Sequence, residues 1–250
     1  MLDTDTLTTV GVGMITKQNP ALIEVDIQND FCTGGALAVR DSNKVAELSN
    51  KLARLFNQKK WRIFLSRDWH PANTKHFTEF GGPWPTHCIQ ETEGAKFHPR
   101  LEYPATAYVL SKGTGTEDDG YSAFDGQIYG HPLAEYLRYF QIDTLFICGL
   151  ATDYCVKATV LDALYKYRYP VYLVTDACKA VNINNLKDPR RSEPKIKEII
   201  SYLLRRGLDL SDENIALQEM RRAGATFTTT KNVLRMLHKS IEQNEENDDC

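Results

Sequence analysis

Four chemically reactive side chains stand at or just after short apolar runs of the chain. They are two carboxylates, an amine and a thiol, at Asp26, Asp68, Lys112 and Cys155. In an open parallel sheet, ligands bind outside the carboxyl ends of the strands, so these groups are expected at one edge. Each alone has an ordinary explanation: a turn-capping Asp, a solvated Lys or a buried Cys. Their occurrence together at strand ends favours a common active site.

Cys155 has the features of an activated nucleophile. A helix that begins within the sequence GLATDYC places this thiol in its first turn, where the helix dipole stabilises a thiolate. A nearby Lys112 would lower the pKa of the thiol further, and Asp26 could accept its proton and later return it to a leaving group. The backbone N–H groups of Ala151 and Cys155 are candidates for an oxyanion hole. The pattern predicts nucleophilic catalysis.

A second group, Asp68, His70 and His87, has the residue types of a metal site. Residues i and i+2 of an extended chain point to the same side, so Asp68 and His70 can bind one ion to which the following loop returns His87. One carboxylate and two imidazoles suit Zn, with Fe or Mn as alternatives, and leave positions open for water or substrate. His76 is a candidate fourth ligand. The alternative is that these histidines only form hydrogen bonds at the base of the loop.

The elements that must position these groups follow from hydrophobic patterning. Runs rich in β-branched and aromatic residues predict six strands, at 21–27, 62–69, 107–113, 144–150, 171–177 and 225–230. Apolar residues at three- and four-residue spacing predict helices at 42–59, 132–139, 153–167, 212–223 and 231–242. Their alternation predicts an α/β fold, a doubly wound six-stranded parallel sheet with helices on both faces. Residues 70–106 predict a long functional loop.

Composition excludes several classes of protein. The chain has 250 residues, of which 42% are hydrophobic and 25% charged, as in a soluble globular protein. A net charge of -3 without an Arg/Lys stripe argues against nucleic acid as a partner, and no apolar run approaches the roughly 18 residues of a membrane span. From the acidic, polar N-terminal sequence we expect no secretory signal, and six scattered cysteines indicate reduced thiols. We therefore expect a cytoplasmic protein, with a nuclear or peroxisomal pool left open.

Several motifs together resemble one known family. They are IEVDIQNDF, SRDWHPANTKHF, PWPTHC, SKG, YSAF and GLATDYCV, which begin at residues 23, 66, 83, 111, 121 and 149. This set resembles the nicotinamidases, within the isochorismatase-like cysteine hydrolases. The resemblance implies the six-stranded fold, one divalent metal ion, and deamidation of the small molecule nicotinamide to nicotinate and ammonia in NAD salvage. It also implies that pyrazinamide-like amides are accepted.

The resemblance also implies roles for single residues. Asp26, Lys112 and Cys155 match the family's catalytic positions. Asp68, His70 and His87 match its metal positions, and His76 matches a position that ligates metal in only some members. Phe31, Trp84 and Tyr121 match its ring-binding positions. The Leu150–Ala151 bond matches a cis peptide of the family. Two alternatives stay open: a related hydrolase of another small amide, and a catalytically silent binding module with the same fold.

The chain departs from the family in an insertion at about 183–215. We expect an N-terminal extension at 1–20, a single domain at 21–242 that carries this insertion, and an acidic, disordered tail at 243–250. Apolar residues spaced as in an amphipathic helix follow Pro194. This helix could pack on the domain, cover a subunit contact in a homo-oligomer, or fold near the site. Because the insertion contains no Cys or His, we expect it to be peripheral to the chemistry.

Overall fold

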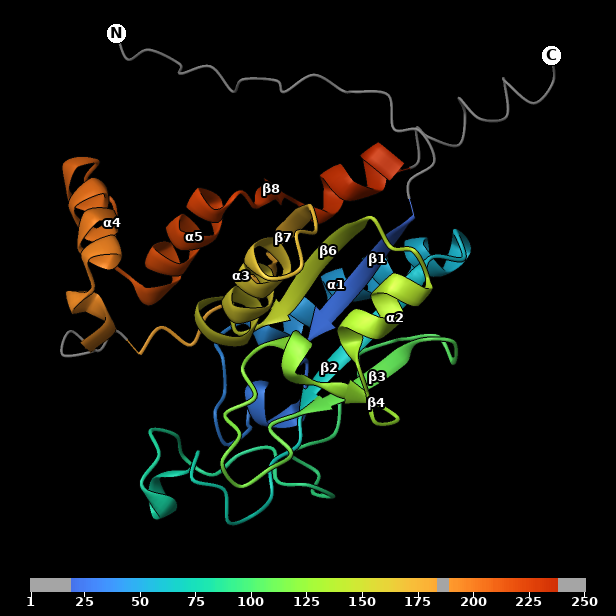
Figure 1. The fold of residues 1–250 in the computed structure, drawn as a ribbon, viewed down its shortest axis with the longest axis horizontal. Coiled ribbons are helices and arrows are strands. Elements are labelled where there is room, and N and C mark those ends of the chain that lie inside the picture. Colours follow the sequence, from blue (N-terminus) through green and yellow to red (C-terminus); the bar gives the residue numbers. More distant parts are fainter. Residues whose placement is uncertain (1–18, 184–188, 238–250) are drawn as a thin grey trace, which may run out of the picture.

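A sheet of eight strands, in the order β5-β4-β3-β2-β1-β6-β7-β8, forms the centre of the computed structural model, which describes residues 19–183 and 189–237 (Figure 1). The strands are β1 (Pro20–Val25), β2 (Arg62–Asp68), β3 (Tyr108–Lys112), β4 (Gln127–Ile128), β5 (His131–Pro132), β6 (Thr144–Leu150), β7 (Val171–Lys179) and β8 (Thr226–Thr228). The six predicted strands are present and parallel. The predicted number was wrong because β4 and β5, antiparallel additions beside β3, are too short to show an alternating pattern.

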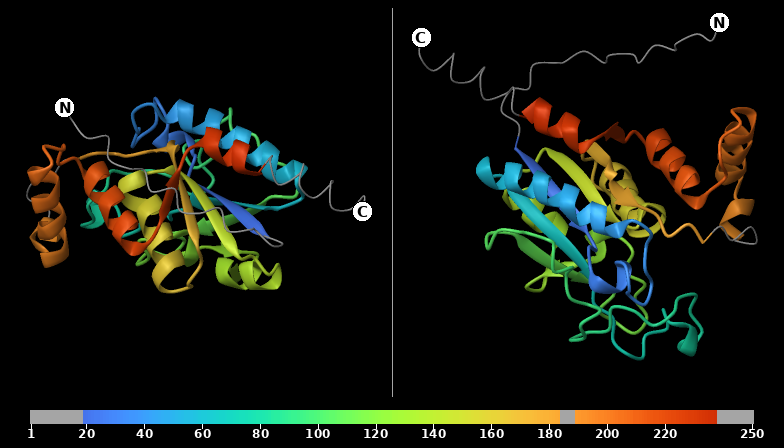
Figure 2. Two further views of the ribbon diagram at one scale, coloured as in Figure 1. Left: turned by 90° about the horizontal axis from the view of Figure 1, so that it is seen from above. Right: turned by 180° about the vertical axis from the view of Figure 1, so that it is seen from behind.

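Helices cover both faces of the sheet, as predicted. The α-helices are α1 (Ser42–Gln58), α2 (Leu133–Tyr139), α3 (Lys157–Tyr165), α4 (Pro194–Arg205) and α5 (Asp212–Ala223). Figure 2 shows α1 and the helix at 230–237 on one face, with α2, α3 and α5 on the other. The short helices are η1 (Asn29–Phe31), η2 (Thr78–Phe80), η3 (Ala123–Asp125), the π-helical turn η4 (Thr152–Val156) and η5 (Pro189–Ser192). The loop predicted for 70–106 contains only η2 and isolated bridges.

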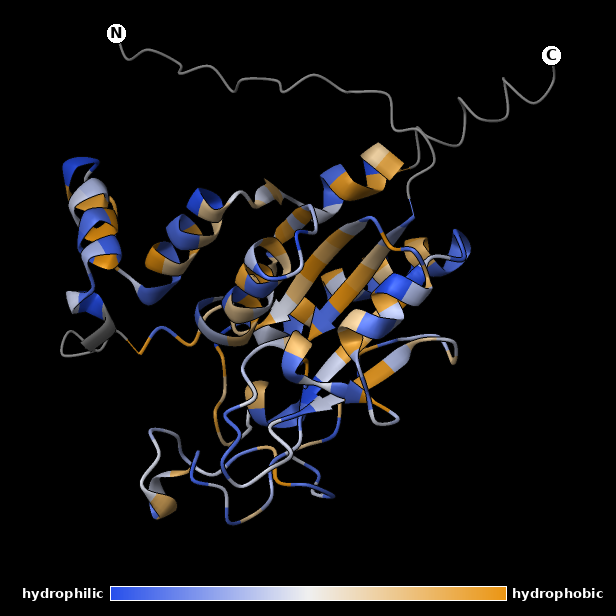
Figure 3. Cartoon of the chain, in the orientation of Figure 1, coloured by the Kyte–Doolittle hydropathy of each residue, from blue (hydrophilic) through white to orange (hydrophobic). Residues whose placement is uncertain are grey.

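The core lies between the sheet and these helices. On α1, the apolar residues at helical spacing, among them Val45, Leu52 and Phe56, are fully buried, and the Phe56 ring packs against Phe146 of β6 at 5.5 Å between centroids. Figure 3 shows the hydrophobic residues gathered on the strands and on the inner sides of the helices. Burial of this apolar surface drives the sheet and its helices together, which fixes the strand ends relative to one another.

The insertion packs on the domain through α5. Pro194 occupies the first turn of α4, as its fixed φ favours. One side of α4 buries Ile199 and Leu203 against Ile215 of α5, in a small apolar cluster separate from the main core, and α4 stands at the outer edge of the molecule (Figure 1). This packing on the domain is one of the three placements that the sequence leaves open.

Parts of the predicted domain layout lie outside the described residues. These are the acidic tail at 243–250, the N-terminal extension at 1–20 except for its last two residues, and the end of the helix predicted at 231–242. The domain boundaries of 21–242 stay a prediction. Among the described helices, none is long and apolar enough to cross a membrane. The five cysteines within the described ranges are all free thiols.

Glu24 on β1 is a buried carboxyl group on the α1 side of the sheet. The Ser49 hydroxyl of α1 donates a hydrogen bond to its Oε1, whereas no described group bonds its Oε2. Burial raises the pKa of Glu24 to about 8, and the hydrogen bond from Ser49 offsets only part of this rise. The side chain is therefore neutral in the folded protein at neutral pH.

We expect Glu24 to make the protein less stable as the pH rises from 4.5 to about 8. The unfolded chain loses this proton near the ordinary pKa of 4.5, while the folded chain keeps it up to about 8. The folded state thus binds more protons in this window, so the free energy of unfolding falls with rising pH by a few kcal/mol. Urea unfolding at about pH 5 and about pH 8 should show that Glu24→Gln loses this part of the pH dependence. The exposed control Glu79→Gln should keep it, and an unchanged pH dependence in Glu24→Gln would contradict the expectation.

Candidate active site

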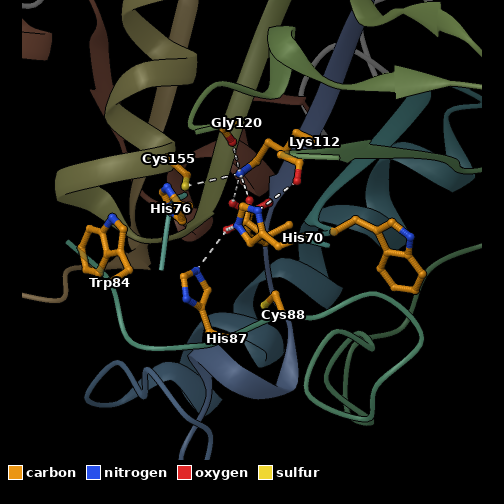
Figure 4. Close-up of polar contacts among 12 residues, drawn as sticks. His70, His76, Trp84, His87, Cys88, Lys112, Gly120 and Cys155 are labelled. Carbon is orange, nitrogen blue, oxygen red and sulfur yellow. Dashed lines mark hydrogen bonds and ion pairs between the residues drawn. The ribbon is translucent and has the colours of Figure 1, made fainter. Parts of the chain in front are cut away.

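The four reactive groups predicted at strand ends meet at the carboxyl edge of the sheet. Asp26 directly follows β1, Asp68 and Lys112 end β2 and β3 at paired register positions, and Cys155 lies in η4 directly after β6. In Figure 4, dashed lines join the Lys112 amine to Cys155 and to the Gly120 carbonyl. The parallel order of β3, β2, β1 and β6 brings these ends together, as the position of a ligand site in such sheets requires.

Lys112 is the centre of this cluster. Its Nζ is 2.8 Å from Asp26 Oδ2 and 3.4 Å from Cys155 Sγ, donates to the Gly120 carbonyl at 2.7 Å, and forms an ion pair with Asp68. Burial of the ammonium favours its neutral form, but Asp26 and Asp68 outweigh burial and raise the pKa of Lys112 well above its ordinary value. The amine therefore stays charged, because an unpaired buried charge would be costly and this one has two partners.

Asp26 has the pKa of a group that can exchange protons near neutral pH. Its Oδ1 accepts a hydrogen bond from Ser66 Oγ at 2.6 Å. Burial raises the pKa of Asp26 to about 6, since the attraction of Lys112 is opposed by the negative charge of Asp68. A base with a pKa near the working pH is the efficient choice for general acid–base chemistry.

The Cys155 thiol differs from the sequence prediction. It lies in the first turn of a helical segment as expected, and Lys112 does pull its pKa down, but burial and the charge of Asp26 raise the pKa well above its ordinary value. The thiol is therefore protonated at neutral pH. Nucleophilic attack by this sulfur requires transfer of its proton to a neighbouring base, and Asp26 is its hydrogen-bond partner.

His70, His76 and His87 bring three imidazoles together beside this cluster, with their ligand atoms within 4.8 Å of one another (Figure 4). Each Nδ1 lies at hydrogen-bond distance from an oxygen: Gly113 O at 2.9 Å for His70, Asp119 Oδ1 at 3.1 Å for His76, and Pro85 O at 2.7 Å for His87. A ring that donates from Nδ1 keeps the lone pair of Nε2 for a metal. Burial lowers the pKa of His76, and that of His87 to about 4, so both rings are neutral at pH 7 as ligation requires.

Asp68 completes a four-residue donor set. Its Oδ2 lies 3.7 Å from His70 Nε2 and 3.9 Å from His87 Nε2. Burial opposes ionisation of Asp68, but the ion pair with Lys112 outweighs burial and holds the pKa of Asp68 well below the usual range. His70 Nε2 is buried and has no hydrogen-bond partner among the described residues. An ionised carboxylate and three converging imidazoles, one of which has an unpartnered buried nitrogen, fit a divalent cation.

Gly113 shapes the backbone around His70. Its φ is +62°, and a Cβ added there would lie 2.3 Å from a ring carbon of His70. Only glycine allows β3 to turn away this close to the imidazole. The SKG motif therefore positions both Lys112 and His70.

Aromatic side chains line the pocket that leads to Cys155. Phe31, Trp84 and Tyr121 share it with Cys155 and Ala151. The indole Nε1 of Trp84 donates to the Tyr121 hydroxyl at 2.9 Å. Aromatic walls of this kind suit the binding of a planar ring.

The sequence of this chain matches a known protein family. The isochorismatase domain pattern matches residues 20–189, more than half of the chain. The chain belongs to the isochorismatase family. The nicotinamidase of Escherichia coli is 43% identical over 180 residues, which cover 65% of this chain and 84% of the relative.

Two solved structures have a fold similar to that of this chain. The pyrazinamidase of Pyrococcus horikoshii in complex with zinc is 38% identical with a TM-score of 0.68, over 84% of this chain and 99% of that chain. PnC1 from L. infantum in complex with nicotinate is 28% identical with a TM-score of 0.66, over 86% of this chain and 94% of that chain. The isochorismatase fold therefore extends over most of the described residues.

The structure brings together every residue that the sequence analysis placed in the site. The Leu150–Ala151 peptide is cis, as the family resemblance implies, and His76 lies with His70 and His87 rather than apart from them. Sequence reasoning missed Ser66, Asp119 and Tyr154, which contact Asp26, His76 and Trp84. Ser66 and Tyr154 stand within two residues of predicted site residues, which is a usable signal. Asp119 lies 43 positions from His76 in an acidic loop, and nothing in its spacing marks it.

Proposed function

We propose that this protein is a metal-dependent nicotinamidase, which hydrolyses nicotinamide to nicotinate and ammonia through a cysteine acyl-enzyme. The observation that carries the proposal is that the cluster of Cys155, Lys112 and Asp26 meets the four metal-ligand candidates beside one aromatic pocket. The E. coli nicotinamidase at 43% identity and the nicotinate complex of the L. infantum relative support the substrate. The zinc complex of the P. horikoshii relative supports the metal.

Asp68, His70, His76 and His87 would hold the ion. When bound there, a divalent cation supplies a Lewis-acidic position for the ring nitrogen of the pyridine. Zn is our first choice for these ligands, with Fe or Mn as alternatives. Phe31, Trp84 and Tyr121 would hold the pyridine ring so that its carboxamide group faces Cys155.

Asp26 acts as the proton carrier in both halves of the reaction. It takes the proton of the Cys155 thiol, and the thiolate sulfur attacks the carboxamide carbon while the N–H groups of Ala151 and Cys155 stabilise the oxyanion. The C–N bond breaks, and the amine leaves as ammonia with the proton from Asp26. Asp26 then accepts a proton from water as the hydroxide attacks the thioester carbon. As the C–S bond breaks, Asp26 returns this proton to the Cys155 sulfur, which restores the thiol, and the product loses its acidic proton to solvent to give nicotinate. Lys112 balances the negative charge on Asp26 and on the sulfur throughout.

Ammonia release from nicotinamide, measured together with the metal content of the purified protein, tests this proposal. We expect about one divalent ion per chain and equal amounts of ammonia and nicotinate. Metal-loaded protein that binds nicotinamide without releasing ammonia would instead indicate a silent binding module. Ammonia from other amides but not from nicotinamide would indicate a different hydrolase of the family. A cytoplasmic location and a homo-oligomer stay predictions.

A further inference from the structure

Tyr154, in the helical turn that carries Cys155, lines two separate cavities. One is the pocket of Cys155, which it lines with Trp84 and Tyr121. The other is a cavity of about 80 Å³ that the insertion helps to form, with Arg191 and Ile196. We propose that Tyr154 is a specificity-determining residue that closes the substrate pocket on the side of the insertion, and that the cavity behind it is a latent subsite for polar substituents on the substrate ring. This inference rests on the proposed function.

The Tyr154 ring is held as part of an aromatic wall. Its centroid lies 4.6 Å from that of Trp84, with the rings at 80°, and 6.2 Å from that of Tyr121, with the rings near parallel. Its backbone N–H donates to the Ala151 carbonyl at 3.0 Å, which fixes the turn that carries it. Edge-to-face contacts with centroids at this distance stabilise one ring orientation. The wall therefore blocks passage from the substrate pocket toward the insertion.

The Asp153 side chain, next to Tyr154, holds the chain just before the insertion. Asp153 accepts hydrogen bonds from the N–H groups of Val181 and Asn182 at 3.0 and 2.9 Å. Val181 itself lines the substrate pocket. Removal of the Tyr154 ring would thus open a passage whose remaining walls stay fixed, rather than let the pocket collapse.

The cavity behind Tyr154 is polar and large enough for a substituent. A volume of about 80 Å³ holds several water-sized groups. Lys157 and Arg191 line it, paired with Glu219 at 3.0 Å and with Asp212 at 2.5 Å. Arg191 also has a buried Nε without a hydrogen-bond partner among the described residues. A buried N–H that lacks an acceptor favours a ligand group that supplies an oxygen.

The test measures kcat/KM for nicotinamide and for nicotinamides that carry a methyl or a hydroxymethyl group at ring carbon 5 or 6. The wild-type protein should reject the substituted amides. Tyr154→Ala should raise their kcat/KM relative to that of nicotinamide by about tenfold or more at one ring position, with the hydroxymethyl amide favoured over the methyl amide. Tyr154→Phe keeps the ring and should keep the wild-type ratio. Tyr154→Leu, whose side chain fills more of the space than alanine, should give an intermediate ratio of kcat/KM values. It replaces the alanine variant in the test if that variant is unstable.

Leu37→Ala is the matched control, because Leu37 lines the substrate pocket but not the cavity. It should enlarge the pocket without a gain for the substituted amides. The inference is overturned if the wild-type protein accepts the substituted amides as well as nicotinamide, or if Leu37→Ala and Tyr154→Ala change the ratio equally. Calorimetric titration of Cys155→Ala variants with the same amides measures, without turnover, how large a ring substituent the pocket accepts. A Tyr154-dependent limit in binding, with no ammonia from the wild-type protein, would reject the proposed hydrolysis and leave Tyr154 only as the residue that limits the size of the bound ring.

Discussion

Cys155→Ala is expected to abolish ammonia release from nicotinamide while binding of nicotinamide survives. In the proposed mechanism the Cys155 sulfur forms the acyl-enzyme, and loss of a nucleophile of this kind lowers kcat by roughly four orders of magnitude or more. The ring is bound by other groups, so the Kd should change little. A coupled ammonia assay and calorimetric titration of the same protein preparation measure the two quantities.

Cys178→Ala is the matched control for this experiment, since Cys178 is a free, buried thiol on β7 that does not line the substrate pocket. It should keep the activity. Alkylation followed by mass spectrometry should modify Cys155 before Cys148 or Cys178, and nicotinamide should slow that modification. Rapid modification of Cys148 or Cys178 with loss of activity, while Cys155 stays unmodified, would show that the nucleophile is wrongly assigned.

His87→Ala is expected to harm nicotinamide much more than benzamide. If the ion held by Asp68 and the histidines binds the ring nitrogen, its loss removes a contact that benzamide, which lacks this nitrogen, never makes. A contact made equally in the ground state and the transition state is uniform binding, so KM should rise more than kcat falls. The discrimination should be about 2–4 kcal/mol, or roughly 30- to 1000-fold in kcat/KM.

The exposed histidine His131, which pairs with Glu135 away from the pocket, provides the control. His131→Ala should keep both the metal and the activity. Metal content must be measured for each variant, and circular dichroism must show that the fold is intact. Equal losses for nicotinamide and benzamide in His87→Ala would mean that the ion only organises the loop, and the substrate orientation proposed here would then be wrong.

Much of the fold could be predicted because its signals are local. The six parallel strands are short apolar runs, and α1 shows apolar residues at three- and four-residue spacing, so periodicity alone locates them. The two-residue strands β4 and β5 could not be found, since an alternating pattern needs more residues than they have. The insertion was visible as a helical pattern after Pro194. The packing of this helix against α5 could not be predicted, because an amphipathic face would be buried equally well in any of the three placements.

By itself, the sequence determined which reactive groups stand at strand ends and therefore which edge of the sheet holds them. Asp26, Asp68, Lys112 and Cys155 needed only strand positions and the rule that parallel strands end at one edge. Their protonation was decided by the tertiary structure: burial raises the pKa of the Cys155 thiol, where helix position alone predicts a lowered one. The same holds for distant partners such as Asp119, and for Tyr154 as the wall between two cavities. Burial and contact are properties of packed space, and residue spacing along a chain carries no measure of either.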